Sequence, residues 1–419
     1  MMKTSHVHPS DIRAIARLAT DATLGLTDLV ENLHADITRI PRIPARRSRS
    51  RTRGIPALVY RSVRGVTRTV GLAADAVLGQ IVPLVGARKS SALREAVLAA
   101  ANGIVGDYLK ATGNSLAIPM QFRINGRPLV LSPGTLRMSV PEGGRRLLVL
   151  VHGLCMNDLQ WRYDGHSHGA MLARELGYTP VYLHYNSGLH ISVNGRLFAE
   201  RLQDLTKAWP EPVEELAIIG HSMGGLVTRS ACHYGTQAGH AWTKMLHKLV
   251  VLGTPHHGAP LERVGNWVET VLRAVPYAAP FARLGMLRSA GITDLRHGSV
   301  LDEDWEGKDR FLRQQDKRTP LPLPAGVPCY AVAGRLARRT GRTGERLIGD
   351  GLVPLQSALG QHEDPARQLA FPESNQWIAE GVGHLELLGN AEVYARLRGW
   401  LAEGTQNALT TSSARSTSR

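Results

Sequence analysis

Short runs of β-forming apolar residues alternate with helical patterns between about residues 117 and 402. The run Leu147–Val151 is apolar at every position, as expected for a strand buried on both faces of a sheet. Strands are predicted at Met120–Ile124, Pro128–Leu131, Leu147–Val151, Pro180–Tyr185, Leu216–Gly220, Leu249–Leu252, Cys329–Ala333 and Trp377–Glu380, and helices at about 168–176, 193–208, from 224 and at about 388–402. The first two strands form a hairpin, and the later alternation is typical of a parallel sheet with right-handed crossovers. The pattern therefore predicts an α/β fold with a mostly parallel sheet flanked by helices.

The first 112 residues have a purely helical pattern. Small or apolar residues recur every three or four positions in three stretches, which predicts amphipathic helices packed along these seams as a small antiparallel bundle. The seams are Ile12, Ile15, Ala19, Ala22, Leu26, Leu29 and Leu33; then Val59, Val63, Val66, Val70, Ala73 and Val77; then Leu93, Val97, Ala100 and Ile104. Three roles stay open for this region: a structural appendage, a lipid-surface adsorber, or a cap or docking module for the domain that follows.

Positive charge is concentrated in this part of the chain. Residues 1–140 hold 20 of the 50 Lys and Arg residues but only 8 of the 35 Asp and Glu residues. Six arginines crowd the Pro-flanked segment 41–56: Arg42, Arg46, Arg47, Arg49, Arg51 and Arg53. The segment is predicted to be a solvated loop, and the alternative is contact with an anionic membrane or lipid surface. No aromatic residue interleaves the arginines and no recognition fold accompanies them, so specific nucleic-acid binding is not expected.

Composition excludes several protein classes. Three cysteines are too few to form the disulfide framework of a small secreted domain. The N-terminus lacks the apolar core of a signal peptide, and no uncharged apolar run reaches the roughly 18 residues that span a bilayer. We therefore expect a cytoplasmic protein, with peripheral membrane contact as the alternative. The Ser/Thr-rich tail 403–419 is predicted to be disordered.

A Gly-x-Ser-x-Gly motif follows the predicted strand 216–220 and opens a helix. The motif alone is weak, but its strand–turn–helix context is the one that nucleophilic serines require. Ser222 is predicted to be a nucleophile on a strained turn, with His221 before it and with Gly220 and Gly224 giving room for close packing. The helix N-terminus would direct the Met223 N–H toward a developing oxyanion.

Ser222 needs a base and an acid partner, which in this topology follow in the order serine, acid, histidine. Asp350 lies in a Gly-flanked turn after the strand at 329–333, and His384 lies in a Gly-flanked loop before the last helix. These two residues complete the predicted triad, with Asp364 and His362 as fallback acid and base. Leu154, after the strand at 147–151, is predicted to supply the second oxyanion N–H. The neighbouring His152 is expected to brace the turn rather than to act in catalysis.

Four separated motifs resemble the α/β-hydrolase superfamily, and within it bacterial lipases and GPI inositol-deacylase-like lipases. They are Val151–Leu154, Gly220–Val227, Leu252–Gly258 and the loops of Asp350 and His384. The resemblance covers about residues 118–402 and implies a sheet core of the eight-stranded type that acts on carboxylic esters without an organic cofactor. Some lipases of this kind bind a structural calcium ion, but Asp302, Glu303 and Asp304 are expected to be a solvated face.

The resemblance predicts a serine-dependent esterase or lipase. The alternatives are an acyltransferase or thioesterase with the same triad, and a non-enzymatic lipid-surface protein with a vestigial hydrolase core. Residues 257–320 are too long for a plain crossover and are predicted to form a cap or lid, with helices at 261–274 and 278–288 whose apolar faces favour a hydrophobic ester. No metal is expected at the histidine pairs 166/168 and 256/257, and Cys155 is expected to be a small buried hydrophobe.

Overall fold

The computed structural model describes residues 9–37, 52, 55–81, 90–140, 143–259, 288–309, 316–336 and 349–402 of the 419-residue chain. It divides into two compact units. One comprises Met1–Arg94 with Leu109–Ala117, and the other comprises Glu95–Tyr108 with Ile118–Arg419. The six arginines of segment 41–56, the predicted lid helices up to residue 287 and the tail 403–419 lie outside the described residues.

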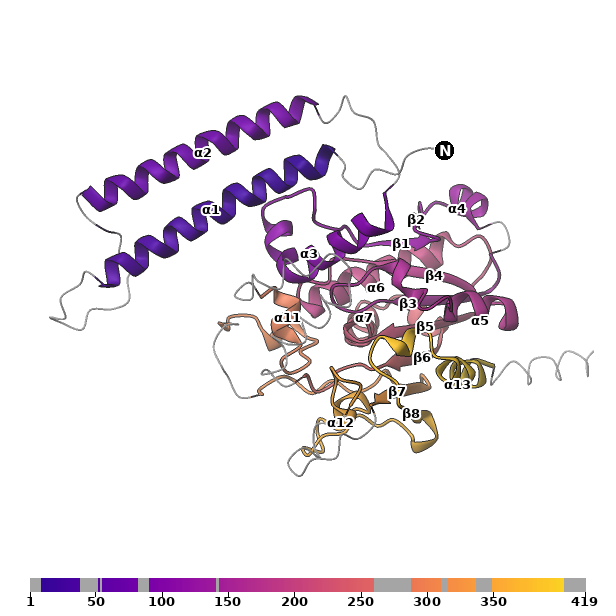
Figure 1. Cartoon of the computed structure of the whole chain (residues 1–419). Coiled ribbons are helices and arrows are strands. Elements are labelled where there is room, and N and C mark those ends of the chain that lie inside the picture. Colours follow the sequence, from indigo (N-terminus) through magenta and orange to yellow (C-terminus); the bar gives the residue numbers. More distant parts are fainter. Residues whose placement is uncertain are drawn as a thin grey trace, which may run out of the picture. The chain divides into compact units, whose positions relative to one another are not determined.

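The first unit contains the antiparallel helices α1 (Pro9–Ile37) and α2 (Ile55–Ile81), which lie side by side in Figure 1. Ion pairs join them at both ends, because Arg13 and Arg17 contact Asp75 while Arg64 contacts Glu31 and Asp28. The predicted helices are therefore confirmed. Among the described residues, no helix is both long enough and apolar enough to cross a bilayer.

The predicted packing of these two helices along their apolar seams is wrong. The described seam valines and isoleucines face outward, with exposed fractions between 42% for Val63 and 65% for Val66. The ion pairs occupy the α1–α2 interface instead, and the side chain of Thr20 packs directly against the backbone of Gly71. The 3.6-residue periodicity defines an apolar face on each helix, but it cannot say which face meets the partner.

The second unit is built on an eight-stranded sheet in the order β2-β1-β4-β3-β5-β6-β7-β8. The strands are β1 (Gln121–Ile124), β2 (Arg127–Pro128), β3 (Arg146–Val151), β4 (Thr179–His184), β5 (Glu215–His221), β6 (Leu246–Leu252), β7 (Cys329–Arg335) and β8 (Gln376–Glu380). Strands β3 to β8 are parallel, whereas β1 is antiparallel to β2 and β4. Asn125 (φ 51°) and Gly126 (φ 72°) form the tight turn of the β1–β2 hairpin. Seven of the eight predicted strands are confirmed to within three residues at their ends, but the second is wrong in extent, because β2 ends at Pro128 and Leu129–Leu131 are not in a strand.

Helices cover both faces of the sheet (Figure 1). Alternate residues of β3 enter different cores: Val149 packs in the cluster that contains Phe198 of α6 (Ile191–Ala208), and Leu150 packs in the cluster that contains Leu397 of α13 (Ala391–Ala402). The helices are α4 (Pro133–Ser139), α5 (His168–Leu176), α6 (Ile191–Ala208), α7 (Met223–Gln237), α8 (Trp242–Met245), α11 (Ala290–Asp294), α12 (Leu355–Ala358) and α13 (Ala391–Ala402), with 3-10 turns η2 (Asp158–Trp161), η3 (Asp302–Asp304), η5 (Glu373–Asn375) and η6 (Glu386–Leu388). This is the α/β architecture expected from the sequence, a mostly parallel sheet flanked by helices.

The chain order of the strands reverses between β3 and β5. The chain leaves β3 toward β4 and returns across β3 to β5, from which it continues to β6, β7 and β8. In an open parallel sheet such a reversal leaves a crevice at the carboxyl ends of the two strands, which is where ligands bind. The loops after β3 and β5 carry the predicted oxyanion and nucleophile residues.

Helix α3 (Ala92–Ala111) contributes to this unit although the sequence pattern groups it with the N-terminal helices. Its seam residues Ala100 and Ile104 are buried in the same core cluster as Val149. The helix departs from regular geometry at Val105 (φ −133°, ψ 20°). Because its apolar face is used by the sheet core, residues 95–108 belong with the second unit rather than with a region ending at 112.

Candidate active site

Ser222 lies on the turn between β5 and α7, in a backbone conformation that only a strongly constrained residue adopts. Its φ of 55° and ψ of −126° are unfavourable for a side chain with a Cβ. Close packing explains the flanking glycines: a Cβ at Gly220 would lie 2.7 Å from the Cα of Gly225, and one at Gly224 would lie 2.7 Å from the carbonyl oxygen of His152. Ser222 is 1% exposed, and in the described part of the chain its Oγ has no hydrogen-bond partner.

The structure brings together Asp350 after β7 and His384 after β8. Their side chains are joined by a 2.6 Å hydrogen bond between His384 Nδ1 and Asp350 Oδ2. The other carboxylate oxygen, Oδ1, accepts hydrogen bonds from the backbone N–H groups of Leu352 (3.0 Å) and Val353 (2.8 Å). Both side chains are buried. The carboxylate therefore has a fixed orientation and directs one oxygen to the imidazole.

His221 connects this pair with the serine turn. Its Nε2–H donates to the backbone carbonyl of His384 over 3.0 Å, and the centroids of the two rings are 4.7 Å apart. Burial holds the pKa of His221 well below its usual value, so its ring stays neutral. The contact fixes the His384 loop against the residue that precedes Ser222.

Gly253, directly after β6, lies close to the same pair of side chains. A Cβ at this residue (φ 56°) would lie 2.9 Å from Asp350 Oδ2 and 3.1 Å from His384 Nδ1. The ends of β5, β6, β7 and β8 thus meet at one edge of the sheet, as parallel strands require.

The loop after β3 contacts Ser222 directly. A Cβ at Gly153 would lie 2.9 Å from the Cβ of Ser222. Leu154 is the next residue in the chain, so its backbone N–H lies near the candidate nucleophile. Leu154 and Met223 are both buried. Within the described residues, neither of their backbone N–H groups donates to a protein acceptor. Two unpaired donors beside a serine are what an oxyanion site needs.

His152 is held as a neutral brace. Its Nδ1–H donates to the carbonyl of Gly153 over 2.8 Å, its ring stacks on Tyr185 at 4.3 Å, and the Tyr185 hydroxyl donates to the His152 carbonyl. Complete burial lowers the pKa of His152 to about 3. These contacts agree with the bracing role expected from the sequence.

The fallback acid and base lie elsewhere. The Asp364 side chain is exposed and forms an ion pair with Arg367, and the Asp364 backbone N–H donates to His362 Nδ1. Asp302 pairs with Arg196, and the Asp304 carboxylate accepts backbone N–H groups, including that of Thr319. No cluster of three or more His, Cys, Asp or Glu side chains among the described residues is arranged to hold a metal ion. Cys155 is fully buried, and burial raises its thiol pKa to about 12.

Helix α3 supports these loops, a contact that the helical pattern of the sequence did not predict. The carbonyl of Gly103 accepts a hydrogen bond from Ser289, and a Cβ at Gly103 would lie 2.9 Å from the backbone nitrogen of Cys155. The carbonyl of Gly106 accepts from the side chain of Asn186. Two glycines three residues apart inside a helical pattern were the available signal, since interior helix glycines indicate close approach of another backbone.

Comparison with known proteins gives one family-model match and several solved structures of low similarity. Residues 144–319 match the family model described as PGAP1-like alpha/beta domain. The fold is similar to Bacillus licheniformis lipase BlEst2 in its mature form, with 16% identity, 67% of this chain and 98% of that chain covered, and a TM-score of 0.39. It is also similar to the Pyrococcus furiosus esterase Pf2001, with 13% identity, 62% and 83% of the two chains covered, and a TM-score of 0.37. No curated protein matches the sequence.

The expected resemblance to the α/β-hydrolase superfamily is thereby confirmed. The protein has an α/β fold with a mostly parallel eight-stranded sheet flanked by helices, and its residues 144–319 are similar to the PGAP1-like alpha/beta domain.

Proposed function

We propose that the protein is a serine-dependent carboxylic ester hydrolase that acts through an acyl-enzyme. The observation that carries the proposal is the hydrogen-bonded pair of His384 and Asp350, tied by His221 to the strained turn of Ser222. An imidazole with a fixed carboxylate partner next to an otherwise unpaired serine hydroxyl is the arrangement that makes serine a nucleophile.

In the proposed reaction His384 takes the proton of Ser222 as Oγ attacks the ester carbonyl. Asp350 stabilises the imidazolium that forms, and the N–H groups of Leu154 and Met223 bind the oxyanion. His384 then gives its proton to the leaving alcohol, and a water molecule, activated by His384, hydrolyses the acyl-enzyme.

A hydrophobic ester is the substrate class that we propose. Support comes from the apolar helical patterns predicted for the insertion 257–320, most of which lies outside the described residues. An acyltransferase or a thioesterase would use the same triad with a different acceptor or leaving group. Analysis of the products in the presence of an alcohol acceptor separates these activities.

Labelling with an alkyl fluorophosphonate tests the nucleophile. We expect one phosphonyl group on Ser222, located by peptide mass spectrometry, and hydrolysis of p-nitrophenyl esters with an optimum in acyl length. Ser222→Ala should abolish both signals, whereas the exposed Ser374→Ala variant should keep them. Equal labelling and turnover in Ser222→Ala would refute the assignment. Absence of both signals in the wild-type protein would favour the vestigial-core alternative.

We further propose that the helices α1 and α2 contact an anionic lipid surface. The outward row formed by Val59, Val63, Val66 and Val70 supports this, together with the exposed arginines Arg61 and Arg68 on the same helix. Apolar and cationic side chains on one helix are the combination that binds anionic interfaces.

Co-sedimentation of the full chain with vesicles of phosphatidylserine and phosphatidylcholine tests this contact. We expect binding at low salt that weakens as salt screens the arginines. The double variant Val66→Glu/Val70→Glu should bind at least about tenfold more weakly, since it removes apolar burial and adds negative charge. Met138→Glu, at the 78% exposed methionine of α4, is the matched control. Identical binding by all three proteins would contradict the proposal.

A further inference from the structure

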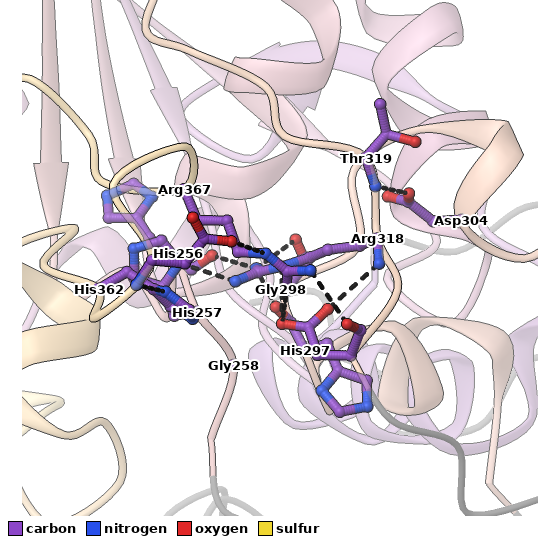
Figure 2. A network of polar contacts seen from close by, with 12 residues as sticks. His256, His257, Gly258, His297, Gly298, Asp304, Arg318, Thr319, His362 and Arg367 are labelled. Atoms are coloured by element: carbon purple, nitrogen blue, oxygen red, sulfur yellow. Dashed lines mark hydrogen bonds and ion pairs between the residues drawn. The ribbon is translucent and has the colours of Figure 1, made fainter.

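A second cluster of polar side chains surrounds a small, partly open cavity of about 20 Å³ in the unit that contains the sheet. Figure 2 shows its network of hydrogen bonds and ion pairs. The lining side chains come from α7, from the loop after β6, and from segments near residues 318 and 367: Arg229, His256, His257, Arg318 and Arg367. Five basic or potentially basic groups therefore face one small space, and none of them has a role in the proposed ester hydrolysis.

The arginines of the cavity outnumber their carboxylate partners. Asp316 serves two of them, because its Oδ2 lies 3.3 Å from Arg318 Nε and also pairs with Arg367. Arg318 is further fixed by the carbonyl of His256, at 2.7 Å, and by His257 Nδ1, at 2.8 Å. Arg367 also reaches the exposed Asp364. The third arginine, Arg229, takes no part in these ion pairs.

Arg229 is a buried cation without a carboxylate partner in the described part of the chain. Its side chain contacts His256 Nδ1 at 3.3 Å and the carbonyl of Leu321, and its Nε has no hydrogen-bond acceptor. Burial and the charge of Arg318 lower its pKa to about 10, which still leaves it protonated at neutral pH. A buried charge without a counter-ion is costly, so the side chain should be compensated by something that binds there.

The histidines add to this excess of donors. Arg229 donates to Nδ1 of His256, so the proton of the neutral ring is on Nε2, which is buried and has no partner among the described residues. Burial keeps the pKa of His256 well below its ordinary value, so the ring does not add a charge of its own. The unpaired groups of the cluster are thus N–H donors, and an anion with several acceptor oxygens would complement them.

We propose that this cavity binds an oxyanion of the phosphate class, either inorganic phosphate or the phosphate group of a larger monoester. Arginine is suited to this ligand because its planar fork matches two oxygens of one phosphate, and the donors approach from several segments as a tetrahedral anion requires. The site is independent of the chemistry at Ser222.

Calorimetric titration of the full chain at constant ionic strength tests the proposal with two probes, inorganic phosphate and glycerol 3-phosphate. We expect one saturable site for at least one probe, and the tighter of the two identifies the source of the phosphate. Arg229→Met should weaken this binding on the order of 100-fold, since it removes a buried charged donor. Arg335→Met, at a partly exposed arginine that pairs with Glu380, should bind like the wild type.

Thermal unfolding supplies a second readout. Without phosphate, Arg229→Met should be at least as stable as the wild type, because it removes an uncompensated buried charge. With phosphate, only the wild type should gain stability, since ligand binding to the folded state raises its midpoint. If Arg229→Met does not fold, Arg367→Gln should weaken binding about tenfold by removing one charged donor. No saturable binding of either probe, equal stabilisation by chloride, or unchanged binding in a folded Arg229→Met or Arg367→Gln variant would overturn the proposal.

Discussion

Asp350→Asn should lower kcat for ester hydrolysis about 10⁴-fold while leaving the fold intact. The reason lies in the two backbone N–H groups, of Leu352 and Val353, that donate to Oδ1 of Asp350. In the asparagine variant these donors select the amide oxygen for that position. The amide NH₂ then faces His384 Nδ1 and donates to it. The imidazole proton is thereby moved to Nε2, and the ring cannot accept the proton of Ser222.

The fallback acid provides the matched control for this variant. Asp364→Asn makes the same chemical change at an exposed carboxylate, and its kcat should stay within about twofold of the wild type. The measurement is the hydrolysis rate of a saturating p-nitrophenyl ester, with the thermal unfolding midpoint as the check on folding. A large loss of kcat in Asp364→Asn, together with full kcat in Asp350→Asn, would contradict the assignment of Asp350 as the acid and would favour Asp364.

Acidification from pH 6.5 to pH 5 should reduce the free energy of unfolding by at least about 3 kcal/mol. Burial lowers the pKa of His152 to about 3 and that of His168 to about 4, and it also lowers the pKa values of His221, His256 and His257. Below pH 6.5 the unfolded chain binds protons at these histidines, whereas the folded chain does not. Stability is therefore lost as the pH falls, by up to about 1.4 kcal/mol per pH unit for each histidine until its folded pKa is reached.

Denaturant unfolding at several pH values between 5 and 7 checks this dependence. His168→Gln should reduce the slope of the free energy of unfolding against pH by the contribution of one histidine, because a glutamine does not take up a proton in the unfolded state. His168 is suited to this test since its Nε2–H donates to the carbonyl of Leu387, which a glutamine amide can also do. A midpoint that does not change over this range would show that these rings are protonated in the folded protein.

The sequence alone predicted the sheet and the loops that carry the candidate triad. Strands such as Leu147–Val151 are apolar at every position, and the turns at Ser222, Asp350 and His384 contain glycines that local chemistry requires. Each of these signals depends only on residues that are close in the sequence, so it can be recognised without knowledge of the tertiary contacts. The structure then places His384 and Asp350 within hydrogen-bond distance.

The features that could not be predicted depend on contacts between distant segments. The apolar seams of α1 and α2 define a face, but the ion pair of Arg64 with Glu31 determines which face meets the partner helix. The hydrogen bond from His221 to the His384 backbone joins residues 163 positions apart. No local periodicity encodes either contact, because both depend on how the completed elements pack.

The position of α3 decides where the chain can be shortened. A fragment beginning at residue 118, the start suggested by the sequence pattern, would lose Ala100 and Ile104 from the sheet core and would leave Asn186 and Ser289 without their acceptors on α3. A fragment beginning near residue 90 keeps these contacts and omits the outward-facing valines of α2. Those exposed valines would favour self-association of the full chain at high concentration. The useful truncation point for crystallisation therefore lies before α3.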